Sequence, residues 1–63
     1  MRTKAGERVN ELWLKATRET VEAAWAEAVR LRPLLDETEL DYLEGLASVF
    51  EYYTGRMPDA PSA

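Results

Sequence analysis

The chain has 63 residues, a net charge of −4, two tryptophans, no cysteine and no histidine. A chain this short forms one domain at most and buries only about 60% of the surface that its unfolded form exposes. Without cysteine or histidine it has neither a disulfide framework nor the usual ligands of a structural zinc ion. Oligomerisation remains as a way to stabilise a marginal core, and the hydrophobic fraction of 46% argues against disorder.

Charge is divided unevenly along the chain. Residues 1–32 carry seven basic and five acidic side chains, whereas residues 33–63 carry one basic and seven acidic side chains. The opposite signs favour an antiparallel pairing of the two halves, although each exposed ion pair contributes less than about 1 kcal/mol.

Neither a membrane span nor a secretory signal is visible in the sequence. No apolar run approaches the roughly 18 residues of a membrane-spanning helix. The N-terminal stretch "MRTKAGERVNEL" lacks the apolar centre of a signal peptide. We therefore expect a soluble cytoplasmic protein that does not enter a membrane.

The first expected element is a single helix over residues 4–31. This segment contains no proline, and Gly6 is its only glycine. Pro33 ends the helix, because proline has no amide hydrogen and disfavours the α conformation in the residue before it, here Arg32.

A turn over residues 32–36 leads to the second expected helix, over residues 37–54. The Asp36 side chain can cap the free amides of this helix, and Glu39, three residues later, completes a capping box. The glycine that follows the helix is its expected stop. Residues 56–63 are expected to form a flexible C-terminal tail.

The apolar residues of the two helices differ in how widely they spread. On the second helix they occupy about half of the circumference, but on the first they spread further than one partner helix can cover. The first helix would also be longer, ~40 Å against ~27 Å, and would overhang its partner. These features predict an all-α antiparallel two-helix hairpin that pairs with a second copy into a homodimeric four-helix bundle.

The expected core and dimer residues follow the apolar faces of this hairpin, and three polar residues of the first helix fall among them. We expect these three, Asn10, Thr17 and Thr20, to fix the register of the bundle or to hold a cavity water. The core and dimer residues are Val9, Leu12, Trp13, Val21, Ala24, Ala28, Leu31, Leu40, Leu43, Ala47 and Phe50.

Two pairs of carboxylates are candidates for metal binding. The E-x-x-E pair Glu19 and Glu22 and the D-x-x-E pair Asp41 and Glu44 resemble the acidic pairs with which all-α nucleotide pyrophosphohydrolases of the MazG kind hold magnesium. Such an ion needs oxygen ligands from facing helices. The helical projection instead places these pairs on outward faces, so we expect no metal and no cofactor. Because nucleophilic cysteine and basic histidine are also missing, we expect no enzymatic activity.

Two surface features predict a binding site for another protein. Four carboxylates of the second helix follow helical spacing without a basic residue between them, and neighbours four apart repel by a few tenths of a kcal/mol. They are either a docking face for a basic partner or a solubilising surface. Two aromatic residues project towards the edges of the apolar faces, where aromatic side chains commonly anchor partners. The expected partner-binding residues are Trp25, Tyr52, Glu37, Asp41, Glu44 and Glu51.

One resemblance suggests a different partner. The stretch "LLDETELDYLEGL" and the length of the chain resemble the Rop family of plasmid RNA-binding four-helix bundles. The resemblance implies a bundle that binds RNA through a basic and polar face on its first helices, here Arg8, Lys15 and Arg18. A net charge of −4 argues against a nucleic-acid partner, because phosphate contacts supply much of such affinity.

The sequence therefore predicts a small non-catalytic protein–protein interaction module, a regulatory or adaptor protein, that acts as a homo-oligomeric helical bundle. Two alternatives stay open. One is a Rop-like bundle associated with RNA or DNA. The other is an accessory subunit of a larger enzyme complex, in which the wide apolar arc of the first helix contacts a different chain.

Overall fold

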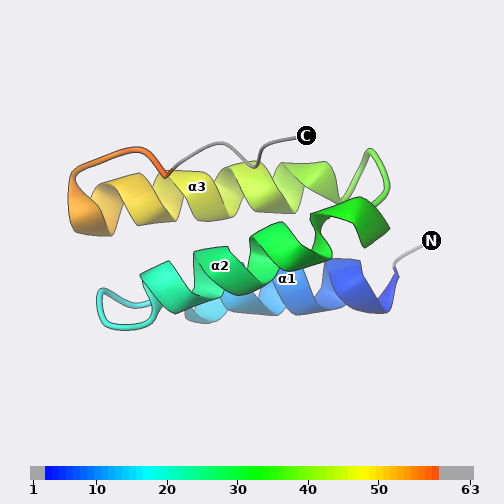
Figure 1. Ribbon diagram of the computed structural model, residues 1–63, viewed down its shortest axis with the longest axis horizontal. Coiled ribbons are helices and arrows are strands. Elements are labelled where there is room, and N and C mark those ends of the chain that lie inside the picture. Colours follow the sequence, from blue (N-terminus) through cyan, green and yellow to red (C-terminus); the bar gives the residue numbers. More distant parts are fainter. Residues whose placement is uncertain (1–2, 59–63) are drawn as a thin grey trace.

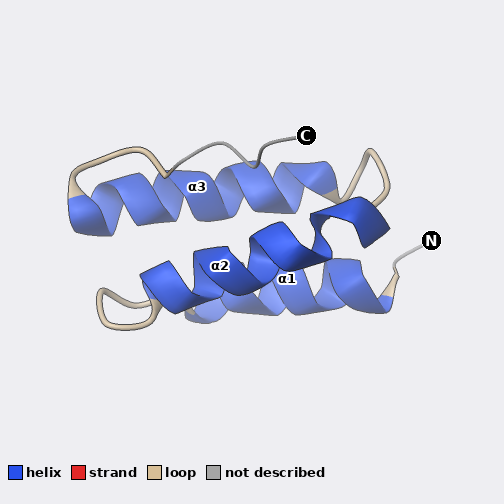
Figure 2. Cartoon of the chain, in the orientation of Figure 1, coloured by secondary structure: helices blue, strands red, loops and turns tan. Residues whose placement is uncertain are grey.

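The computed structural model describes residues 3–58, which form three α-helices, one short 3-10 helix and no strand. The α-helices are α1 (Lys4–Lys15), α2 (Val21–Leu31) and α3 (Leu40–Thr54), and the 3-10 helix η1 is Arg32–Leu34. Figure 1 shows that α2 runs antiparallel to both α1 and α3, so the chain goes up, down and up again. Figure 2 shows the two loops at opposite ends of this bundle.

The expectation of an all-helical fold is confirmed, but the single helix over residues 4–31 is wrong. The chain leaves the helical conformation at Ala16, whose φ of −63° and ψ of 137° are extended, and becomes helical again at Val21. The continuous helix would be ~40 Å long, whereas the longest dimension of the molecule is 32 Å. The chain therefore folds back on itself where the sequence analysis expected it to continue straight.

Two threonines build the reversal between α1 and α2. The N–H of Thr17 donates to Oγ1 of Thr20 at 2.9 Å, and the two hydroxyls lie 3.1 Å apart. The N–H of Val21 donates to the carbonyl of Thr17 at 2.8 Å and starts the new helix. Threonine hydroxyls compete in this way with helical hydrogen bonds. Both threonines are exposed, so the expectation that they point inward is wrong.

The reversal also changes the meaning of the wide apolar arc. Because α1 and α2 are separate antiparallel helices, their apolar residues reach one core from two sides and face α3 across it. The centre of this core is the cluster Val9, Ala24, Ala28, Leu43 and Leu46. The overhang, one of the grounds for expecting a four-helix bundle, does not exist in this fold, and the core buries Val9, Ala24 and Ala28 of the apolar arc.

Most of the predicted core residues are buried inside the single chain. The buried ones are Val9, Val21, Ala24, Ala28, Leu43 and Phe50. The partly buried ones are Leu12, Trp13, Leu31, Leu40 and Ala47. The ring of Trp13 packs at 6.3 Å from that of Tyr42 and lies against Gly45, where a Cβ would come within 2.6 Å of the ring. A glycine at this position lets α1 and α3 approach closely.

Local sequence signals set both ends of α3, although the helix starts later than predicted. The predicted capping box forms: the N–H of Glu39 donates to Oδ1 of Asp36 at 2.8 Å, and the N–H of Asp36 donates to Oε1 of Glu39 at 3.1 Å. Residues 37–39 are a turn, so α3 starts three residues later than predicted. Gly55 ends the helix with a φ of 74°, as expected from a C-terminal glycine.

The connection from α2 to α3 and the C-terminal segment depart in part from the prediction. Instead of a plain turn over residues 32–36, a 3-10 helix over Arg32–Leu34 continues α2 and is followed by an extended Leu35. Of the expected tail, residues 56–58 are not helical. The expectation of flexibility for residues 59–63 lies outside the described residues.

The Glu39 carboxylate joins the start of α3 to the start of α1. It accepts from the N–H of Thr3 at 2.8 Å and from the Thr3 hydroxyl at 2.9 Å, and its side chain is only 2% exposed. The same hydroxyl accepts from the N–H of Gly6 at 2.9 Å and thereby caps α1. The N–H of Thr3, the N–H of Asp36 and the Thr3 hydroxyl hold the pKa of Glu39 below its usual value in spite of burial.

Replacing Thr20 by valine tests the reversal. The variant keeps the shape of the side chain but removes the acceptor of the Thr17 N–H, so we expect unfolding to require about 0.5–1.5 kcal/mol less in urea denaturation. Thr38→Val is the matched control, because Thr38 is also an exposed threonine in the turn before a helix. Equal stabilities of the two variants would show that the Thr20 hydroxyl does not hold the turn.

Gly6→Ala should destabilise the protein although alanine favours helices by about 1 kcal/mol. A Cβ at Gly6 would overlap the Glu39 carboxylate, so we expect a net loss of about 1–3 kcal/mol in urea denaturation. In a Glu39→Ala background the overlap is gone, and Gly6→Ala should become neutral or stabilising. Equal effects of Gly6→Ala in both backgrounds would contradict this contact.

The lowered pKa of Glu39 also predicts acid sensitivity. A carboxylate whose pKa falls on folding stabilises the protein above its unfolded pKa, near 4.5, and loses this contribution as the pH drops through the folded value. Glu39→Gln should therefore lower the Tm at pH 7, and its difference from the unmodified protein should shrink towards pH 3. Glu37→Gln, at an exposed position in the same turn, is the control. A difference that stays constant from pH 7 to pH 3 would rule out this role.

Candidate functional site

A groove between α2 and α3 is the best candidate for a binding site. It has a volume of about 380 Å³, an apolar floor and charged side chains along its edges. The floor consists of Trp25, Leu40, Leu43 and Ala47, and the charged side chains are Arg32, Asp41 and Glu44. We call this site the α2–α3 groove.

Trp25 is the largest side chain of the groove. Its ring packs edge-on against Phe50, with the ring centroids 6.3 Å apart and an interplanar angle of 61°. The side chain is only half-buried, so part of the indole stays accessible from the groove. The contact with Phe50 holds the ring in place without covering it.

The α3 edge of the groove is acidic. Asp41 and Glu44 are exposed there, and Glu51 follows Glu44 two helical turns later on the same side of α3. None of the ion pairs within residues 3–58 involves these three carboxylates. Arg32, at the end of the groove where α3 begins, also makes no ion pair in that part of the chain. An apolar floor therefore lies beside two carboxylates and one guanidinium, none of which makes an ion pair within residues 3–58.

A contact between the start of α2 and the end of α3 lies beyond the other end of the groove. Arg56 donates to Glu22 at 2.7 Å, and its guanidinium lies 5.2 Å from the centroid of the Phe50 ring. The side chain of Thr54 accepts from the N–H of Arg56 and donates to the carbonyl of Phe50. Arg56 was expected in a loose tail, but these contacts hold it against the bundle.

The structure brings together only part of the predicted partner-binding set. Trp25, Asp41 and Glu44 line the same groove, and Glu51 lies on the same side of α3. Glu37 is exposed in the turn before α3. Tyr52 is 82% exposed and packs on the neighbouring Tyr53, with ring centroids 5.3 Å apart, and it does not line the groove.

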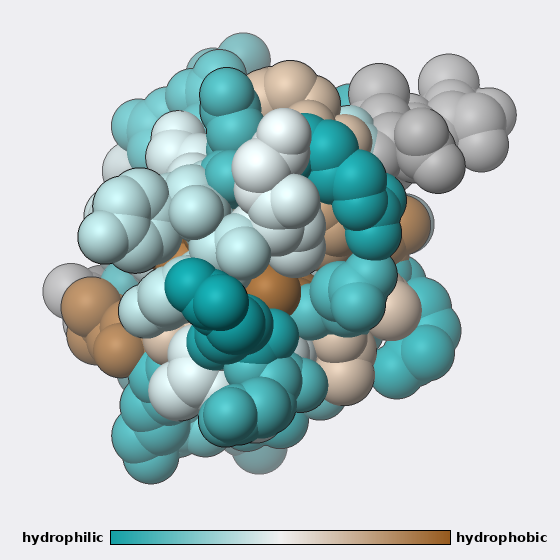
Figure 3. Space-filling view, turned by 90° about the vertical axis from the view of Figure 1, so that its left-hand side faces the viewer, coloured by the Kyte–Doolittle hydropathy of each residue, from teal (hydrophilic) through white to brown (hydrophobic). Residues whose placement is uncertain are grey.

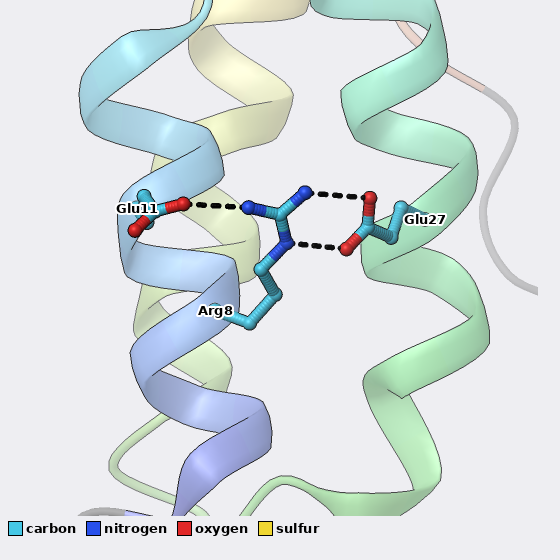
Figure 4. Close-up of polar contacts among 3 residues, drawn as sticks. All are labelled: Arg8, Glu11 and Glu27. Atoms are coloured by element: carbon cyan, nitrogen blue, oxygen red, sulfur yellow. Dashed lines mark hydrogen bonds and ion pairs between the residues drawn. The ribbon is translucent and has the colours of Figure 1, made fainter.

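Of the three basic residues suggested by the Rop resemblance, Arg8 is paired with carboxylates of the chain itself. Arg8 lies between two carboxylates, as Figure 4 shows: it donates to Glu11 at 2.6 Å and to both oxygens of Glu27, at 2.5 and 3.0 Å. This pairing raises the pKa of Arg8 and lowers that of Glu27. A hollow of about 300 Å³ between α1 and α2 contains these three residues together with Lys15. Its charged groups are of both signs and largely satisfy one another.

The other surface features are weaker candidates for a binding site than the α2–α3 groove. Figure 3 shows the end of the molecule that carries the α1–α2 loop, where the surface is mostly hydrophilic with scattered hydrophobic spots. Leu14, Leu34 and Met57 are exposed at separate places in the chain, which is common for single apolar side chains. Within residues 3–58, no group of three or more acidic side chains is placed to share a metal ion. No helix in this range has both the length and the hydropathy needed to cross a membrane.

Sequence reasoning found the acidic side of α3 and Trp25 but did not find the groove. The pairing of α2 with α3 is already part of the predicted hairpin, but helical periodicity does not show that Trp25 of α2 and the apolar residues of α3 line one groove. Comparison of the chain with protein-family models, curated proteins and solved structures finds no match. Function must therefore be inferred from the residues of the chain themselves.

Proposed function

We propose that the chain is a small non-catalytic protein-interaction module, a regulatory or adaptor protein, that binds its partner through the α2–α3 groove. One observation carries the proposal: an apolar floor with a partly accessible tryptophan lies directly beside carboxylates that have no ion-pair partner within residues 3–58.

The composition of the groove supports protein binding. Tryptophan is among the residues that contribute most to binding energy at protein interfaces, especially when neighbouring groups exclude water around it. Here Trp25 is already oriented by its contact with Phe50, so a partner would lose little entropy in fixing it. Leu40, Leu43 and Ala47 supply the apolar surroundings on the α3 side.

The chemistry of the chain supports a non-catalytic role. Strongly displaced pKa values often mark catalytic groups. In this chain the displaced groups are Arg8, Glu27 and Glu39, and each is held in an ion pair or a helix-capping contact outside the groove. The sequence also contains no cysteine and no histidine that could serve as nucleophile or general base.

The fold weakens the reasons for the homodimer, the accessory subunit and the nucleic-acid alternative. The homodimer and the accessory subunit were both expected because the first helix left a wide apolar arc uncovered, and Val9, Ala24 and Ala28 of that arc are now buried in the core of the single chain. The nucleic-acid alternative depended on Arg8, Lys15 and Arg18, and of these Arg8 is paired with two carboxylates. The proposal therefore places the interface at the groove and does not require self-association.

Charge reversal at the edge of the groove tests the proposal. Glu44→Lys changes an exposed residue and should leave the fold intact, but it should weaken binding about tenfold if that edge meets a partner of opposite charge. The measurement is quantitative co-purification from the source cells with the tagged protein and with the variant. Proteins retained by the unmodified chain should be depleted with Glu44→Lys.

Glu7→Lys on α1 is the matched control, because it changes the net charge equally at an exposed position outside the groove. Thermal melts of both variants check that they remain folded. An identical set of retained proteins with Glu44→Lys, Glu7→Lys and the unmodified chain would refute the groove as the binding site.

A further inference from the structure

We infer that the occupant of the α2–α3 groove is an amphipathic α-helix of another protein, whose apolar stripe is flanked by lysine or arginine. The inference rests on the proposed function, because it specifies the partner of the same groove. Two observations support it: the shape of the apolar floor of the groove and the charge of its α3 edge.

The floor has the geometry that receives a helix. Leu40, Leu43 and Ala47 follow one another along α3 at helical spacing, and Trp25 faces the same space from the antiparallel α2. A helix placed along this line would be a fourth member of the bundle, packed on two others. Helices that bind in such grooves present anchors at positions i, i+3 or i+4, and i+7.

An extended peptide fits the site less well. Peptides that bind as strands satisfy their backbone groups on an exposed sheet edge. The described residues of this chain form no strand, so an extended backbone over the apolar floor would leave its N–H and C=O groups unpaired. A helix satisfies these groups internally and brings only its side chains to the floor.

The carboxylates at the α3 edge of the groove favour a positively charged occupant. Asp41 and Glu44 line the groove, Glu51 continues the same side of α3, and none of the three makes an ion pair within residues 3–58. Arg32 is the one basic side chain among the lining residues, so the groove keeps an excess of negative charge. Bringing a lysine or arginine beside the carboxylates relieves their mutual repulsion, whereas an acidic helix would add to it. The partner helix should therefore carry basic residues next to its apolar stripe.

A second copy of the chain is a poorer occupant for the same reason. Its α2–α3 groove would bring another acidic edge, and each copy has a net charge of −4.

A peptide library tests the inference with a defined probe. Displayed random peptides of about 16 residues, ~24 Å long as helices, are selected on the full chain and counter-selected on Glu44→Lys. The enriched sequences should show apolar residues at i, i+3 or i+4, and i+7 with lysine or arginine beside them. In fluorescence anisotropy a selected peptide should bind Glu44→Lys about tenfold more weakly than the unmodified chain. Its affinity for Glu7→Lys should be unchanged.

Several results would overturn the inference. These are selected peptides without the apolar spacing, selected peptides with acidic flanks, a scrambled peptide that binds equally well, or no enrichment at all. Sedimentation that shows a dimer dissociated by Glu44→Lys would instead assign the groove to a second copy. If the peptides fail but Glu44→Lys still depletes co-purified proteins, only the class of occupant is wrong. If both the peptide selection and the co-purification with Glu44→Lys fail, the proposed function is refuted as well.

Discussion

The reversal of the chain between Ala16 and Thr20 is the constraint on which the rest of the structure depends. It divides a segment without proline into two helices, and it places α2 where it can cover the apolar side of α1. A chain this short buries only a small hydrophobic core, so each apolar face contributes a large share of its stability. Folding the helix back gives three apolar faces around one centre instead of two faces and an exposed overhang.

Glu39 makes the second long-range connection. Its backbone and side chain complete the capping box with Asp36, and the same carboxylate receives the N–H and hydroxyl of Thr3. The buried Glu39 carboxylate thus accepts hydrogen bonds from its own turn and from Thr3, which lies 36 residues away in the sequence. A carboxylate that accepts several hydrogen bonds stays ionised despite burial. The absence of a side chain at Gly6 makes room for it, so the starts of α1 and α3 depend on each other.

The sequence predicts the features that depend on neighbouring residues and misses those that depend on distant ones. The capping box at Asp36 and the stop at Gly55 are local hydrogen-bonding and backbone preferences, and both are confirmed. The end of the long helix was misplaced. The segment around Thr17 differs from a helical one by only a few tenths of a kcal/mol per residue in intrinsic preference, so packing of α2 on the core decides the outcome. The contact of Thr3 with Glu39 has no local signal at all.

The candidate site shows the same division. Helical periodicity correctly gathers the carboxylates Asp41, Glu44 and Glu51 on one side of α3, but it cannot tell a solubilising surface from the edge of a groove. That distinction depends on what lies beside them, and α2 supplies Trp25 there. Unpaired carboxylates beside an apolar floor repel one another and repel a second acidic copy of the chain. In the proposed function the same charges favour a basic helix on the floor, so that a local loss of stability would serve selectivity for the partner.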